Sequence, residues 1–597
     1  MSRTCRDSNY CNHASTATIT VDCGERGFWA RFARIFFPLF SVIIPLKFSS
    51  IMLPEIPGMW QEDAIGWLIN PWPYGFFFII SAIALIINWI ALPQPKHDKN
   101  HWGYVFSGLF ILLWLSAMLG LYNASQYATG FLILEYLLGL INYLLAVKLF
   151  LSVPGNRIRL ISGWGIGIVL MFLNAIYQYF IGFAVLEEYI RDTGQQVSTV
   201  LLAKIADRRT SAPYDLSNSL AGAILLGTPV LLIFAGKMAK YFTPEKISRN
   251  IFTTLVCVAA IFIFVTTRSR AAILALLAAI ALTAILKIKN LKLKIGAVVL
   301  IALIISGGGL YIANSKRGLG SMQVRLDYAA TAAKMAFSHP FAGGGWGNFQ
   351  FDYMLTKNDG TEEAPRDPHN MILSFASQCG IISGLLIVAL MIIPFYGCWR
   401  LNGFKKRENQ LIAFGLMAFS IHALAEIHLL IPSLMAMWLT AGMLLLIPEE
   451  SSTADIHGRN PLLLLPAIAG IVLFSYGLYA DYCFQQVTNA SAMNRDMRHN
   501  FNKLDKLRPY SPYHHLLIAR RLTPLSPVEA GSFARVAAER SPRDPEPYII
   551  LLENAIAIHD TTAAQNALDE ARKRFPHNWL FDGTPEEALE QIKKSRL

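Results

Sequence analysis

The amino-acid sequence predicts an all-α membrane protein that crosses a bilayer many times and ends in a soluble helical domain. Of its 597 residues, 54% are hydrophobic and only 15% are charged, whereas about a quarter of the residues of soluble proteins are charged. Apolar runs recur along the chain, each near the roughly 20 residues that a helix needs to cross a bilayer. Because a helix satisfies its own backbone hydrogen bonds, such runs predict helical spans.

The apolar runs predict about thirteen spans. They lie near residues 33–52, 72–92, 103–122, 131–151, 160–182, 217–235, 250–266, 271–286, 295–313, 371–396, 410–427, 429–447 and 461–480. We therefore expect a tail at 1–32, a membrane domain at 33–480 and a soluble domain at 481–597. The tail has no pattern of a cleavable signal, so the first span is expected to be retained.

The distribution of Lys and Arg predicts the orientation of the spans. Basic residues follow the second, fourth, sixth, eighth and tenth spans, whereas the short loops at 53–71 and 123–130 contain none. The positive-inside rule places the first set of loops and the N-terminal tail in the cytoplasm. Residues 183–216, 266–270 and 314–370 then lie on the outer face, and the soluble domain follows them outside the cytoplasm.

The same distribution accounts for the net charge of +12, which in a soluble protein would suggest nucleic acid. No ordered platform of basic and aromatic residues accompanies it, so we expect no nucleic-acid partner. The seven cysteines form no CxxC pair, and this disfavours zinc and redox sites.

Several arginines lie on the predicted outer face, where the rule disfavours positive charge. Arg268 and Arg270 sit in a turn too short to escape the rule, and Arg209 and Arg325 lie in longer segments. A guanidinium pairs with phosphate oxygens through two parallel hydrogen bonds, so converging arginines suit a lipid diphosphate. The alternatives are contacts to lipid head groups or ion pairs with Asp207, Asp215 or Asp327.

The polar segment 314–370 is predicted to be a catalytic loop because it carries glycine, aromatic and charged residues at defined places. His369 follows Asp367-Pro368 at the start of the tenth span, and its imidazole can take a proton near neutral pH. Asn370 is expected to cap the helix that follows. Gly343, Gly345 and Gly347, followed by Asn348, allow tight turns and close approach to a ligand. No Gly-Lys-Ser/Thr follows them, so they do not form a Walker-type phosphate loop.

The C-terminal 117 residues contain a repeated pattern. Pro509, Pro542 and Pro576 are 33 and 34 residues apart, which is the period of a tetratricopeptide-like helix pair. Such a module offers a concave surface for peptides, and its more common role is assembly with another envelope protein.

Four segments together resemble the O-antigen ligase and polymerase superfamily of bacterial envelope glycosyltransferases, over roughly residues 160–447. They are Arg209 with Asn218 and Ala221; Ser269-Arg270 with two alanines; Arg325 with the run from His339-Pro340 to Asn348-Phe349; and His369-Asn370 with Leu373 and Gly380. Two departures stand out. Ala212-Pro213-Tyr214 replaces the family's Gly-Thr-Phe, and Gln378 replaces a Glu.

The resemblance implies a fold of the GT-C type and metal-independent, inverting transfer of a glycan from undecaprenyl diphosphate at the outer face of the bacterial inner membrane. It implies that His369 is the general base and that Arg209, Arg270 and Arg325 bind the diphosphate. The supporting residues would be Asn218, Ser269, Gly343, Gly345, Gly347, Asn348 and Asn370. No cofactor and no metal is implied. Glu187, Glu188 and Glu426 remain candidate carboxylates, and we interpret them as surface or structural charges.

The identity of the acceptor is left open, and it can be a lipid, a glycan or a protein. These correspond to a ligase of lipopolysaccharide biosynthesis, a polysaccharide polymerase and a protein O-oligosaccharyltransferase. A flippase or transporter of lipid-linked glycans is the alternative from another class, but it predicts inverted repeats and charge at mid-membrane. A scaffold that only anchors the C-terminal repeats would leave the outer arginines unexplained.

Overall fold

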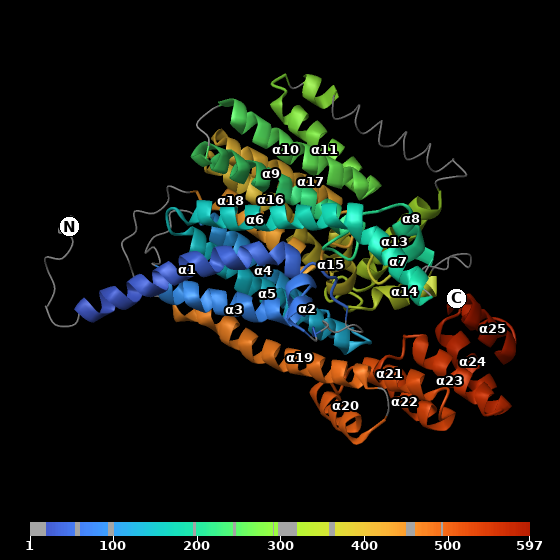
Figure 1. Ribbon diagram of the computed structural model, residues 1–597. Coiled ribbons are helices and arrows are strands. Elements are labelled where there is room, and N and C mark those ends of the chain that lie inside the picture. Colours follow the sequence, from blue (N-terminus) through green and yellow to red (C-terminus); the bar gives the residue numbers. More distant parts are fainter. Residues whose placement is uncertain are drawn as a thin grey trace.

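The structure is a computed structural model in which every regular element is helical (Figure 1). It describes residues 19–53, 60–61, 63–92, 101–194, 197, 199–242, 246–290, 292–296, 319–356, 365–448, 460–490 and 493–596. The expected all-α fold is confirmed, and no β-strand occurs within these ranges.

The membrane part contains α1 (Ile19–Lys47), α2 (Ala64–Ile69), α3 (Tyr74–Ala91), α4 (Trp102–Leu119), α5 (Tyr127–Leu151), α6 (Asn156–Tyr177), η1 (Gln178–Gly182), α7 (Phe183–Thr193), α8 (Thr199–Ala206), α9 (Ser217–Phe242), α10 (Lys246–Thr266), α11 (Arg270–Lys287), α13 (Leu319–Ser338), α14 (Phe349–Thr356), α15 (Met371–Cys379), α16 (Ile381–Arg400), η2 (Gly403–Lys405), α17 (Arg407–His422), α18 (Pro432–Leu446), η3 (Pro461–Leu464) and α19 (Leu465–Asn489). The C-terminal part contains α20 (Arg495–Leu507), α21 (Tyr513–Leu522), α22 (Pro527–Arg540), α23 (Glu546–Ala557), α24 (Thr561–Arg574), η4 (Trp579–Phe581) and α25 (Pro585–Arg596).

The helices confirm a multi-pass membrane protein. Within the described ranges, nine helices are long and apolar enough to cross a bilayer, and α18 and residues 250–266 of α10 form two shorter apolar helices. The span expected at 295–313 lies almost entirely outside the described residues, as do most of the tail at 1–32 and part of the loop at 314–370.

Two expected spans have different limits in the structure. The span expected at 371–396 is two helices, α15 and α16, which meet at Gly380 with φ of +93°. A Cβ on Gly380 would lie 2.4 Å from the carbonyl oxygen of Phe341, so only glycine fits this break. His369 therefore precedes the short helix α15 rather than a span. The span expected at 410–427 ends at His422, and residues 423–431 form a loop.

Glycines bring α1 and α6 into close contact. A Cβ on Gly163 would lie 2.4 Å from the backbone oxygen of Pro38, and one on Gly167 would lie 2.5 Å from that of Val42. Small residues four positions apart let helix backbones approach closely within a membrane. Helix α5 packs against α3, α4, α18 and α19, and most of its residues are buried.

The basic loops collect at one end of the bundle, which we call the Arg157 end. The buried guanidinium of Arg157 donates from Nη2 to Oδ1 of Asn409 at 2.6 Å and from Nη1 to the carbonyl of Ile447 at 3.3 Å. Lys237 pairs with Glu408 at 3.1 Å. The start of α6, the end of α9, the start of α17 and the end of α18 therefore meet there. The opposite ends of these helices carry the polar cluster described below.

The C-terminal helices are joined to the bundle through α19, which continues from the membrane part to Asn489 without a break (Figure 1). The domain boundary expected at residue 480 thus falls inside one helix. From α21 to α25, each helix packs against the next. Arg508, at the end of α20, fastens this helix to α19. Its Nη2 donates to the buried carboxylate of Asp481 at 2.7 Å and to the carbonyl of Gly477 at 3.3 Å.

Replacing Arg508 by methionine is expected to lower the melting temperature of the detergent-purified protein. The variant leaves the carboxylate of Asp481, which is 1% exposed, without its cationic partner, at a cost of about 3–5 kcal/mol. Arg498→Met on the exposed side of α20 serves as the matched control. Equal melting temperatures for the two variants would contradict this role of the ion pair.

Candidate functional site

The end of the bundle opposite Arg157 contains a buried carboxylate, that of Glu426 in the loop between α17 and α18. Its side chain is 6% exposed. Oε1 accepts a hydrogen bond from Nη2 of Arg325 at 2.9 Å, and Oε2 lies 4.0 Å from Nδ1 of His369. Helix α13, the approach to α15 and the α17–α18 loop thus meet at one carboxylate. We call Arg209, Asn218, Arg325, His369 and Glu426 the Glu426 cluster.

Arg209 and Asn218 complete the cluster from the segment that leads into α9. The guanidinium of Arg209 donates from Nη2 to Oδ1 of Asn218 and from Nε to the carbonyl of Thr267, both at 3.0 Å. Asn218 in turn hydrogen-bonds to Glu426. Arg209 therefore links the α10–α11 turn to the carboxylate through one amide side chain.

The environment of Glu426 shifts its pKa in opposing directions. Burial raises the pKa, and the charge of Arg325 and the hydrogen bonds from Asn218 and Arg325 lower it. The charge of Arg209 lowers it further. The net direction is upward. The charges of Arg325 and Arg209 therefore offset part of the shift that burial causes.

His369 is held by its backbone as much as by its side chain. It has φ of +54°, a conformation that non-glycine residues seldom adopt, and its N–H donates to Oδ1 of Asp367 at 2.9 Å. The imidazole stacks on the ring of Tyr328 with 5.8 Å between centroids. Strained backbone that the surroundings fix in place is a common feature of functional positions.

Asn370 caps α15, the role expected from the sequence. Its Oδ1 accepts from the backbone N–H groups of Ile372 and Leu373, both at 3.0 Å, and its Nδ2 donates to the carbonyl of Leu424 at 3.0 Å. The same amide therefore fixes the α17–α18 loop against the start of α15. This contact sets the distance between His369 and Glu426.

A pair of buried histidines lies behind the cluster. Nε2 of His428 and Nδ1 of His422 are 2.8 Å apart. Burial lowers the pKa of His428 well below its usual value, and the neighbouring His422 and His369 lower it further. His428 is therefore neutral at physiological pH. It adds no positive charge beside His369.

Arg270 is not brought into the Glu426 cluster by any contact in the described part of the chain. It is the first residue of α11 and is exposed. Ser269 before it caps α11, because its Oγ accepts from the N–H of Ala272 at 3.3 Å. The link from this turn to the cluster runs instead through the carbonyl of Thr267 and Arg209.

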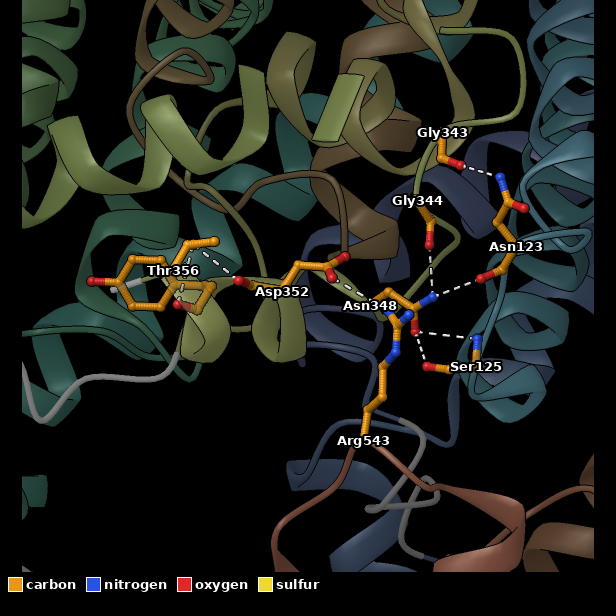
Figure 2. Close-up of polar contacts among 9 residues, drawn as sticks. Asn123, Ser125, Gly343, Gly344, Asn348, Asp352, Thr356 and Arg543 are labelled. Atoms are coloured by element: carbon orange, nitrogen blue, oxygen red, sulfur yellow. Dashed lines mark hydrogen bonds and ion pairs between the residues drawn. The ribbon is translucent and has the colours of Figure 1, made fainter. Parts of the chain in front are cut away.

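The glycine-rich run forms a separate structure, centred on Asn348 (Figure 2). The amide Nδ2 of Asn348 donates to the carbonyls of Gly344 at 2.6 Å and Asn123 at 2.9 Å, while its Oδ1 accepts from the backbone and hydroxyl of Ser125. Asn123 donates to the carbonyl of Gly343 at 2.7 Å. The loop is thereby fastened to the connection between α4 and α5.

The three glycines allow close approach to protein backbone and side chains. Gly343, Gly345 and Gly347 have φ of +67°, +94° and +77°. A Cβ on Gly343 would lie 2.3 Å from the backbone nitrogen of Cys379, and one on Gly345 would lie 2.7 Å from Cα of Ala124. Gln378, at the position where the family has Glu, accepts from the N–H of Gly347 at 2.9 Å. These residues shape the loop that leads towards the cluster.

An ion pair connects this loop to the C-terminal helices. Nη1 of Arg543 lies 3.2 Å from Oδ1 of Asp352 on α14 (Figure 2). Burial raises the pKa of Asp352, and electrostatic interactions with Arg543 and His339 oppose the shift. The loop and the C-terminal helices are therefore held in one arrangement.

One group of side chains in the described residues has the composition of a metal site: Asp505, His514 and His515. Arg540 occupies it, because its Nη1 lies 2.6 Å from Oδ1 of Asp505, 3.4 Å from Nε2 of His514 and 3.3 Å from Nδ1 of His515. A guanidinium already supplies the positive charge there, so the group joins α20, α21 and α22 as a structural cluster.

The structure places Glu426 beside Arg325 and His369, whereas the sequence predicts only a surface or structural charge. The only hint was its position in the run His422-Ala-Leu-Ala-Glu426-Ile-His428, between two apolar segments. A charge in such a place is a functional hypothesis by default. Tyr328, which stacks on His369, carried no signal because a tyrosine on a helix is more often part of a core.

The fold and the cluster define a multi-pass α-helical membrane protein with a charged, histidine-containing site at one end of its bundle. Residues 255–389 match the model of a family described as O-antigen ligase. This segment contains Arg270, Arg325 and His369, whereas Arg209 and Glu426 lie outside it. The match supports the resemblance of this chain to the O-antigen ligase superfamily and indicates a glycosyltransferase-like activity. No curated protein matches the chain.

The buried Asp367 predicts a pH dependence of stability. Burial raises its pKa from 3.8 to about 6, although hydrogen bonds from Ser374 and from the N–H of His369 lower the pKa. Between about pH 4 and pH 6 the unfolded chain loses this proton before the folded chain does. The free energy of unfolding therefore falls as pH rises through this window, and the loss is complete above it.

The variant Asp367→Asn is expected to lack this slope, because an amide does not ionise. Denaturation in detergent, followed at several pH values from 4 to 7, measures the difference from wild type. Asp569→Asn, at an exposed position on α24, controls for removal of a carboxylate. A slope as steep in Asp367→Asn as in wild type would refute the assignment.

Proposed function

We propose that this protein transfers a glycan from undecaprenyl diphosphate to a hydroxyl of an acceptor, in the manner of an O-antigen ligase. The observation that carries the proposal is the meeting of Arg325 and His369 at the carboxylate of Glu426. An enzyme of this kind needs cations for a leaving diphosphate and a base for the attacking hydroxyl. The family match over residues 255–389 supports it.

His369 would act as the general base. As the acceptor oxygen attacks C1 of the sugar, the bond from C1 to the diphosphate oxygen breaks and the hydroxyl proton passes to His369. Attack from the face opposite the diphosphate inverts the configuration at C1. With Nδ1 facing Glu426, Nε2 is the nitrogen that would take the proton, and the carboxylate would stabilise the imidazolium that results.

Arg325 and Arg209 would bind the diphosphate and stabilise its charge as it leaves. A guanidinium has five N–H donors, and the bond from Arg325 to Glu426 uses only one of its nitrogens. Arg270, exposed at the start of α11, would contribute from the lipid side of the donor. This charge stabilisation by side chains requires no metal ion in the proposed step.

We further propose that the Glu426 cluster faces the periplasm and that the Arg157 end faces the cytoplasm of a bacterial inner membrane. The basic loops gather at the Arg157 end, and Lys and Arg are retained on the cytoplasmic side of membranes. The donor's lipid would lie in the bilayer, with its diphosphate at the level of the arginines. The C-terminal helices, which would form a tetratricopeptide-like module, then lie in the periplasm.

His369→Ala is expected to reduce transfer by about 10²–10⁴-fold, the usual contribution of a general base. The assay supplies an undecaprenyl-diphosphate oligosaccharide to the protein in nanodiscs and follows release of undecaprenyl diphosphate. His499→Ala, an exposed histidine on α20, is the matched control. Undiminished release by His369→Ala at normal expression and melting temperature would refute the proposed base.

Glu426→Gln is expected to lower kcat while raising the donor KM only slightly, because the amide cannot stabilise the imidazolium. The pH profile of kcat separates this role from a purely structural one: its acidic limb should move when the carboxylate is removed. Glu553→Gln on α23 controls for loss of a carboxylate far from the cluster. An unchanged profile would assign Glu426 to packing alone.

A further inference from the structure

A cavity of about 690 Å³ lies between the membrane part and the C-terminal helices. This volume is within the range of ligand sites, about 300–1,000 Å³. One wall comes from the start of α5, from Trp346 and Gly347 in the glycine-rich loop, and from Gln350 at the start of α14. The opposite wall comes from the end of α19, from α21 and from the start of α23. The cavity therefore exists only because the C-terminal helices are packed against the bundle.

The cavity adjoins the Glu426 cluster through the residues that position it. Asp367, whose Oδ1 accepts the N–H of His369 at 2.9 Å, lines the cavity. Leu430, in the same loop as Glu426, lines it as well. A molecule in the cavity thus lies against the backbone segment that holds the proposed base.

The surface of the cavity combines apolar walls with carboxamides. Leu132 and Ile133 of α5 line it on the bundle side, and Leu516 and Leu517 of α21 line it on the other. Gln350 and Asn489 also reach it, and in the described part of the chain their side chains make no hydrogen bond. A carboxamide has both donors and an acceptor, so it can pair with both groups of a peptide unit.

The charges disfavour an anionic occupant. The acidic and basic lining residues are Arg366, Asp367, Arg520, Asp544 and Glu546, and lysine is absent from the lining. Acidic groups outnumber basic ones, and Arg520 is already paired with Glu546. This balance of charges favours an uncharged occupant over a diphosphate and distinguishes the cavity from the proposed donor site.

We propose that this cavity binds a polypeptide segment of the acceptor and presents a serine or threonine hydroxyl to His369. The inference rests on the proposed glycan transfer. The apolar side chains of the walls suit the apolar side chains of a peptide, and the carboxamides of Gln350 and Asn489 suit an extended backbone. In the step, the hydroxyl oxygen bonds to C1 of the sugar, the proton goes to His369, and undecaprenyl diphosphate departs with the electron pair of the broken bond.

The experiment measures binding and turnover separately on the full chain in nanodiscs. The binding probe is a pooled library of fluorescein-labelled ten-residue peptides, each with one central serine. Asn489→Trp fills the rim of the cavity, and Gln350→Ala removes a carboxamide from the opposite wall. The matched controls are Asn502→Trp on the exposed face of α20 and Gln565→Ala on α24. Release of undecaprenyl diphosphate from the lipid-linked donor is followed in parallel.

The expected result is that wild type and both controls retain a subset of peptides, which become glycosylated when donor is added. Asn489→Trp and Gln350→Ala should weaken their binding at least tenfold, with the donor KM unchanged. Peptide binding that is absent in wild type, or equal in all variants, would overturn the proposal.

Two further results separate the inference from the function on which it rests. Retention of a free oligosaccharide probe in place of peptides, lost in Asn489→Trp, would overturn the proposal and assign the cavity to a glycan acceptor. If peptides bind in the cavity but wild type releases no undecaprenyl diphosphate, the proposed transfer fails, and the inferred acceptor role fails with it.

Discussion

The carboxylate of Glu426 is the constraint around which the polar end of the bundle is arranged. A charge removed from water must be paired and hydrogen-bonded, or it becomes neutral. Arg325, Asn218 and, at a longer distance, His369 meet this requirement from three different parts of the chain. Without the carboxylate, nothing among these contacts would draw the start of α9, helix α13 and the approach to α15 to the same point.

The glycine-rich loop and the C-terminal helices support this arrangement from outside. Asn348 and three glycines in left-handed conformations fix the loop to the α4–α5 connection and to the end of α15. Asp352, which follows the loop on α14, forms an ion pair with Arg543 and so connects the loop to the C-terminal helices. The loop is thus held both by these hydrogen bonds and by the burial of Trp346 and Phe349.

Much of the fold could be predicted from the sequence because apolar runs and basic loops are strong, local signals. The residues at which the helices begin and end were harder to predict. One glycine with positive φ divides the apolar run at 371–396, and its effect depends on the carbonyl of Phe341, a contact that no local pattern reveals. The roles proposed for His369, Arg209 and Arg325 came from their residue types and predicted outer location, together with a resemblance. Glu426 was undervalued because its partners are 101 and 57 residues away along the chain.

The unbroken course of α19 has a mechanical consequence. A helix that is continuous from the lipid to the soluble module transmits displacement along its axis and rotation about it, since no hinge lies between them. Bilayer thickness changes the tilt of a spanning helix at a cost of only fractions of a kcal/mol per ångström. The module at the end of α19 is a lever arm, so a small tilt at the root becomes a larger displacement at α23. The ion pairs of Arg508 and Arg543 oppose that displacement, so a change in bilayer thickness would load the contacts between the module and the bundle.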